Sequence, residues 1–103
     1  MKWIDKNLHI IPINTHIDPY KPVENAIITH GHADHAKPGH KNVLATKETI
    51  EIMKIRYGEN CAENFQELKL NKKLKIDDVS ITFYPAGHIL GSVQVLARSE
   101  EHT

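Results

Sequence analysis

Residues 30–35, with the sequence HGHADH, place three histidines and one aspartate within six positions. Imidazole nitrogens and carboxylate oxygens are common ligands of zinc, and they also suit manganese or iron. On an extended loop, side chains two positions apart point the same way, so His30 and His32 can share one ion while Asp34 and His35 turn towards a second. The pattern predicts a catalytic metal site, because a structural zinc site would use cysteines and the chain has only one.

A second segment, PAGHILGS at residues 85–92, carries His88 between two glycines. Glycines at such positions let the backbone approach a ligand closely. A histidine alone at a strand end is more often structural than functional. Next to the HGHADH loop, however, His88 supplies a third protein ligand and leaves one position of a zinc ion open for water. We therefore predict that His88 is a metal ligand.

Short apolar segments must position these motifs. Residues 23–29 (VENAIIT) contain a continuous apolar run that predicts a buried strand, so the HGHADH loop follows the carboxyl end of that strand. Thr46 is placed to cap a helix predicted over residues 48–57, and Gly58 is placed to end it. The apolar stripe predicted for that helix consists of Ile50, Met53 and Tyr57, widened by Ile52 and Ile55.

The other predicted elements are mostly strands. Pro12 makes residues 8–13 an edge strand or a strand end, and two further prolines predict a turn over residues 16–22. Alternating or continuous apolar patterns predict the remaining strands at residues 43–46, 65–70, 74–76, 79–84 and 92–97. One helix among several strands predicts a mixed α/β fold, in which an edge and part of one sheet face stay uncovered.

Composition narrows the class of protein but not its partner. The chain has 103 residues, 40% of them hydrophobic, and a formal net charge of zero, which is typical of one soluble globular domain. Balanced charges select neither nucleic acid nor a membrane surface. The first residues lack the apolar stretch of a signal peptide, and no run approaches the length of a membrane span. With a single cysteine besides, we expect a cytoplasmic protein without a membrane partner.

The motifs resemble those of a known superfamily. HGHADH is similar to the HxHxDH signature of the metallo-β-lactamase fold, and PAGHILGS is similar to the second metal motif of its nucleic-acid-processing branch, which includes the β-CASP-like mRNA 3′-end processing nucleases. Residues 17–30 (IDPYKPVENAIITH) resemble the start of the DNA-ligase-associated exonucleases of that superfamily. The resemblance covers the chain to about residue 97. It implies an αββα sandwich, of which this chain would be the first, incomplete half.

The resemblance also implies residue roles. His30, His32 and His88 would hold a first zinc ion, and Asp34 and His35 would hold part of a second, with manganese as a possible substitute. Asp34 would also be catalytic, by orienting the attacking water. The implied function is that of a DNA exonuclease-like phosphodiesterase. Its implied partners are nucleic acid, with DNA ahead of RNA, and a DNA ligase and a helicase.

Two features predict that the chain is a fragment. The family pattern has a metal-bridging aspartate and a further histidine after its second motif, whereas no aspartate follows His88 here and the only later histidine is His102. Residues 98–103 (RSEEHT) resemble the translation of a sequencing adaptor. We therefore expect residues 1–97 to be the N-terminal part of a metallo-β-lactamase domain, residues 98–103 to be a non-native tail, and the chain alone to be inactive or nearly so.

Other functions fit the same motifs. The first motif would also serve an RNA 3′-end processing nuclease or a small-molecule hydrolase that acts on a thioester or a lactam. Binding of a metal or of nucleic acid without turnover is a further alternative, and so is an interaction domain that binds no metal. The lysines at 69–75 could contact phosphates, but a solvated hairpin is the simpler interpretation.

Overall fold

A computed structural model describes residues 3–87 and 91–100, so the prediction for His88 lies outside the described residues. The elements in chain order are β1 (His9–Ile10), the 3-10 helix η1 (Ile11–Ile13), β2 (Thr15–Ile17), β3 (Asn25–Ile27), β4 (His40–Ala45), α1 (Lys47–Tyr57), β5 (Ala62–Glu67), β6 (Lys73–Ile76), β7 (Val79–Pro85) and β8 (Val93–Ser99). The predicted mixed α/β class, with one helix and a mixed sheet, is confirmed.

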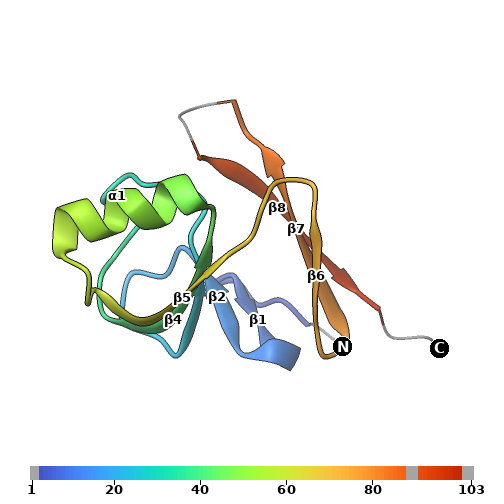
Figure 1. Ribbon diagram of the computed structural model, residues 1–103. Coiled ribbons are helices and arrows are strands. Elements are labelled where there is room, and N and C mark those ends of the chain that lie inside the picture. The colour runs from blue at the N-terminus through green and yellow to red at the C-terminus, as the bar shows by residue number, and fades with distance from the viewer. Residues whose placement is uncertain (1–2, 88–90, 101–103) are drawn as a thin grey trace.

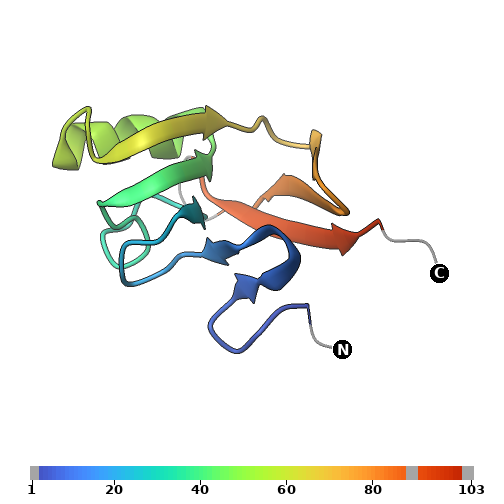
Figure 2. The same cartoon turned by 90° about the horizontal axis from the view of Figure 1, so that it is seen from below.

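The strands form two sheets. The first has the order β1-β2-β3-β4-β5, in which β2 to β5 are parallel and β1 is antiparallel to β2. Figure 2 shows these parallel strands side by side and pointing the same way. The second sheet, β6-β7-β8, is entirely antiparallel. Parallel strands end at a common edge of a sheet, and the loops that follow them are therefore brought together.

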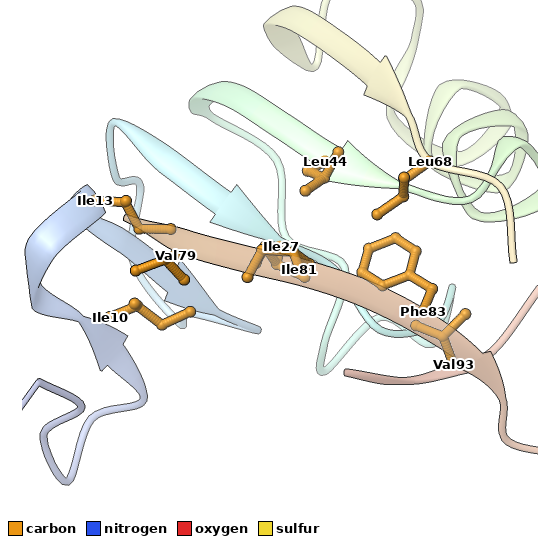
Figure 3. Packing of buried hydrophobic residues seen from close by; sticks show 9 residues of the cluster. All are labelled: Ile10, Ile13, Ile27, Leu44, Leu68, Val79, Ile81, Phe83 and Val93. Carbon is orange, nitrogen blue, oxygen red and sulfur yellow. The ribbon is translucent and has the colours of Figure 1, made fainter. Parts of the chain in front are cut away.

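A hydrophobic core lies between the two sheets. Its buried members are Ile10, Ile13, Ile27, Leu44, Leu68, Val79, Ile81, Phe83 and Val93, and Figure 3 shows side chains from both sheets pointing toward one another. The apolar residues of the predicted alternation in β7, Val79, Ile81 and Phe83, lie in this core, but Ser80 and Thr82 between them are buried as well. Helix α1 packs on the opposite face of the first sheet, so the layers run helix, sheet, sheet (Figure 1).

Local signals fixed the limits of α1. The Thr46 side chain accepts a hydrogen bond from the backbone N–H of Thr49, and Gly58, at φ 97°, ends the helix as predicted. The predicted stripe was too wide, because Ile55 is 85% exposed: only the face that carries Ile50 contacts the sheet. Among the described residues, no helix is both long and apolar enough to cross a lipid bilayer.

The N-terminal strands bear out one prediction and correct another. Strand β1 lies at the sheet edge, as Pro12 indicated, but it covers only His9–Ile10 of the predicted residues 8–13, because Pro12 lies in the 3-10 helix η1. The predicted turn over residues 16–22 starts too early, because Thr15–Ile17 forms strand β2 and only then does the chain turn, at Asp18 with φ 48°. Backbone pairing with β3 outweighs the turn signal of the prolines, which lie further along the chain.

The C-terminal end continues the second sheet. Arg98 and Ser99 belong to β8, and the backbone N–H of Glu100 donates to the carbonyl of Asp78. The Glu100 carboxylate also forms an ion pair with Lys73 of β6. The first residues of the predicted tail therefore follow the geometry of the strand.

Candidate metal centre

The candidate centre lies where β2 and β3 end. Ile17 and Ile27 are paired in the parallel register, and the backbone N–H of Asp18 donates to the carbonyl of Ile27 at 2.9 Å. Asp18 therefore leaves the sheet at the same edge as Thr29 and the HGHADH loop. This edge lies at the carboxyl ends of the parallel strands, where α/β proteins commonly build their sites.

The Asp18 carboxylate connects the two strand ends. Its Oδ1 atom accepts a hydrogen bond from the backbone N–H of Thr29 at 2.8 Å. Its Oδ2 atom accepts the Thr29 hydroxyl at 2.6 Å and lies 3.0 Å from His35 Nδ1. With the Asp18 side chain only 14% exposed, this carboxylate orients groups on both sides of the loop.

The network fixes the tautomers of two histidines. The Thr29 hydroxyl has one proton, which it donates to Asp18, so its 2.9 Å contact with His30 Nδ1 requires that Nδ1–H donates. In the same way His35 Nδ1–H donates to the Asp18 carboxylate. Each neutral imidazole then carries its lone pair on Nε2. This is how outer carboxylates and hydroxyls prepare histidines for metal binding.

The predicted ligands gather around these rings. The ring centroids of His30 and His35 are 4.0 Å apart, and those of His30 and His32 are 4.9 Å apart. Asp34 Oδ2 lies 3.5 Å from His35 Nε2, and the Asp34 side chain is 75% exposed. The structure thus brings together four of the five predicted ligands.

The cluster is suited to a metal ion. One ligand atom from each of Asp18, His30 and His35 lies within 4.8 Å of the others. Ligands of a tetrahedral zinc ion are about 3.3 Å apart when each is about 2.0 Å from it, so the most distant pair would have to approach by up to about 1.5 Å. Two imidazoles and a carboxylate suit zinc, manganese or iron. These residues could hold a metal ion, with its identity left open by the donor set.

The spacing of the motif was interpreted as that of an extended loop, but the loop is not extended throughout. The backbone N–H groups of His35 and Ala36 both donate to the carbonyl of His32, at 2.9 and 2.8 Å, which closes a turn. The turn brings His35 back beside His30. Proximity of His35 to His30 therefore arises from chain reversal, not from the alternation of an extended strand.

Helix α1 supports the loop from the other side. A Cβ atom at Gly31 would lie 2.8 Å from the Ile52 side chain, so only glycine allows this approach. The Arg56 guanidinium donates to the Gly31 carbonyl. In Figure 1 the loop runs beside α1 accordingly. Helix packing thus limits where the first two loop histidines can lie.

The described flanks of His88 adjoin the same loop. The backbone N–H of Val93 donates to the carbonyl of Thr29 at 2.8 Å. The carbonyl of Gly91 accepts the hydroxyls of Thr46 and Thr49 at 2.9 and 3.3 Å. The chain resumes after residues 88–90 next to the residue that precedes His30, and His88 itself lies outside the described residues.

Asp18 and Thr29 belong to this network, but no sequence pattern pointed to either residue. A lone aspartate before a proline has no motif of its own. The usable signal was positional, since Asp18 and Thr29 follow the neighbouring parallel strands β2 and β3. Recognising that required β2, which had been predicted as a turn.

His40, Cys61 and His16 lie outside this network. His40 is 1% exposed, and its Nδ1 atom accepts the backbone N–H of Val23 at 3.1 Å. Burial, with a smaller contribution from His16, lowers the pKa of His40. Burial likewise raises the pKa of the Cys61 thiol, consistent with a structural role for that cysteine.

Comparison with known proteins gives one informative similarity. No protein family model matches the chain. The chain is similar to a protein of Opitutus terrae described as a "Probable DNA ligase", with 29% identity over 105 aligned positions. The alignment covers 99% of this chain but 10% of that protein, so the chain spans about a tenth of the relative's length.

Proposed function

We propose that this protein is a metal-dependent phosphodiesterase that acts on nucleic acid in the manner of a DNA exonuclease, with a site for two zinc ions. The observation that carries the proposal is the group of Asp18, His30 and His35, whose ligand atoms lie within 4.8 Å of one another, with His32 beside His30 and Asp34 beside His35. The resemblance of HGHADH to the metallo-β-lactamase signature supports the same assignment.

The proposal assigns each side chain a role. His30 and His32 would hold one ion together with His88, and Asp34 and His35 would take part in holding the other. The 3.5 Å separation of Asp34 Oδ2 from His35 Nε2 is close to that of two ligands on one ion. Although Asp18 could itself bind a metal ion, the proposal makes it a positioning residue that acts through His35, because its oxygens already accept three hydrogen bonds.

The two ions would supply a nucleophile at neutral pH and stabilise negative charge on the phosphodiester. The chain's own contribution is to fix the donors and to leave Asp34 accessible. An exposed carboxylate next to the ligands can orient a water molecule and hold its proton. This combination suits hydrolysis of a substrate whose transition state gains negative charge.

The similarity to a probable DNA ligase supports nucleic acid as the substrate, with DNA ahead of RNA. A DNA ligase and a helicase are proposed as associated proteins on the family resemblance. A thioester or lactam hydrolase would use the same donors, and an RNA 3′-end nuclease would differ only in substrate.

The test measures metal binding first and hydrolysis second. Zinc and manganese binding by the 103-residue chain would be followed by competition with a chromophoric chelator, in the parent protein and in His32→Ala. His9→Ala is the matched control, because His9 lies on β1 outside the loop. We expect His32→Ala to weaken binding at least about tenfold and His9→Ala to leave it unchanged.

Hydrolysis of end-labelled DNA, end-labelled RNA and a thioester would then be compared with metal in excess. Because the chain alone is expected to be inactive or nearly so, the expected result is slow cleavage at most, fastest on DNA and lost in His32→Ala. Failure to bind either metal would refute the proposal. Metal binding without even slow cleavage of any of the three substrates would favour the alternative, which is metal binding without turnover.

A further inference from the structure

A pocket of about 630 Å³ lies beside the candidate metal centre. Asp34 and His35 of the HGHADH loop form part of its lining, so the pocket is continuous with the candidate metal centre. The rest of the lining includes Lys6, Tyr20 and Lys21. A molecule bound in this pocket would therefore reach the exposed Asp34 carboxylate.

Tyr20 is an aromatic side chain that the fold does not use. It is 82% exposed and belongs to neither core cluster. Large rings left in water next to a site commonly serve as stacking surfaces, because each base of a nucleic acid presents a flat aromatic face. Because Tyr20 lines the pocket, a base bound there could stack on its ring.

The segment that carries Tyr20 is held in place before any ligand binds. Asp18, at its start, is fixed by its hydrogen bonds to Thr29. Pro19 is buried, and Pro22 lies against Gly39, where an added Cβ atom would be 3.1 Å from the proline ring. A surface fixed in advance loses little conformational entropy on binding.

The charges beside Tyr20 favour an anionic ligand. Lys6 and Lys21 are both exposed, and neither forms an ion pair within residues 3–87 and 91–100. The two aspartates of the pocket, Asp18 and Asp34, are instead engaged with His35. Two lysines that form no ion pair among these residues, next to an exposed aromatic ring, match a phosphate backbone with an unstacked base.

Building on the proposed function, we propose that this pocket binds the end of a single-stranded nucleic acid. A base stacks on Tyr20, while Lys21 and Lys6 contact the backbone phosphates. A strand held in this way leads its phosphodiester towards Asp34 and His35. Duplex ends would have to open before they could occupy the pocket.

The test measures binding without cleavage. Fluorescence anisotropy of a fluorescein-labelled oligothymidylate is followed in EDTA, so that metal binding and turnover do not enter. Tyr20→Ala should raise the Kd at least about fivefold, and Tyr20→Phe should restore it to within about twofold, since the ring remains. Tyr84→Ala is the control, because Tyr84 is also exposed but lies on β7 outside the pocket.

The lysines are tested through the salt dependence of the same Kd. Loss of one phosphate contact in Lys21→Ala should make the slope of log K against log salt concentration shallower by about 0.7. Lys72→Ala is the control, since Lys72 is exposed beyond β5 and does not line the pocket. Because the substituted side chains are exposed, thermal melting should confirm that all variants fold.

Equal Kd values for Tyr20→Ala and Tyr84→Ala would overturn the inference, and so would tighter, Tyr20-independent binding of a blunt duplex. The result is separable from the proposed function. Tyr20-dependent binding by a protein that cleaves nothing would support the pocket and count against the phosphodiesterase. Metal-dependent cleavage, with equal Kd values for the parent and Tyr20→Ala, would support the phosphodiesterase and count against the pocket.

Discussion

Replacing Asp18 with asparagine should reverse the tautomers of His30 and His35 in the HGHADH loop. If the new amide oxygen keeps the hydrogen bond from the Thr29 N–H, the amide nitrogen takes the place of Oδ2. That nitrogen donates, so the Thr29 hydroxyl must accept from it and turn its proton towards His30. His35 likewise loses its acceptor and is driven to protonate Nε2. Both proton shifts occupy the nitrogen that would face a metal.

The size of the effect follows from what Asp18 contacts. Changing an outer partner of a metal-bound histidine typically costs tenfold to a hundredfold in affinity, about 1.4 to 2.7 kcal/mol. Since Asp18 acts on His35 directly and on His30 through Thr29, we expect the upper part of that range for Asp18→Asn.

Chelator competition would measure zinc affinity, and nitrogen-15 NMR of the metal-free protein would report the tautomers. Asp78→Asn, in the turn between β6 and β7, controls for the loss of one negative charge. Unchanged tautomers together with zinc affinity within about twofold of the parent would show that the hydrogen-bond reasoning is wrong.

Two further predictions concern stability. Gly91→Ala should lower the free energy of unfolding in urea by more than about 2 kcal/mol, because φ is 84° and the new Cβ would lie 2.6 Å from that of Glu48. Gly58→Ala should lower it less, since a Cβ at this position, with φ 97°, meets no atom within 4 Å. Equal losses in the two variants would show that the contact with Glu48 contributes nothing. His40, whose pKa is lowered by burial, favours its neutral form when folded, so stability should be full above the unfolded pKa of about 6.5 and fall as pH drops below it. His40→Leu should make the urea midpoint depend less on pH between neutral and acidic conditions. An unchanged pH dependence would show that a group other than His40 causes it.

Local chemistry made much of the fold predictable. Thr46 and Gly58 marked the helix limits because capping depends on a few neighbouring backbone groups. The core residues of β7 were readable because its apolar face packs between the sheets, although Ser80 and Thr82 of its other face are also buried. The HGHADH loop was likewise placed after its strand by a short apolar run, and the rings of its three histidines lie near one another.

Features that depend on pairing between distant segments could not be predicted in this way. β2 has only three residues, and its strand geometry comes from its neighbours β1 and β3. The role of Asp18 depends on that register, which no local pattern encodes. The exposure of Ile55 has the same origin, since the predicted stripe could not show how much of α1 the sheet would cover.

The shared carboxylate has a consequence for how two ions would bind. His30 is oriented through the Thr29 hydroxyl and His35 directly, yet both hydrogen bonds end on Oδ2 of Asp18. In the proposed assignment these histidines belong to different ions. Any ion that fixes the Nδ1–H tautomer of one histidine therefore favours the arrangement of Asp18 that the other requires. Asp18→Asn should therefore weaken the binding of both ions, and not that of one alone.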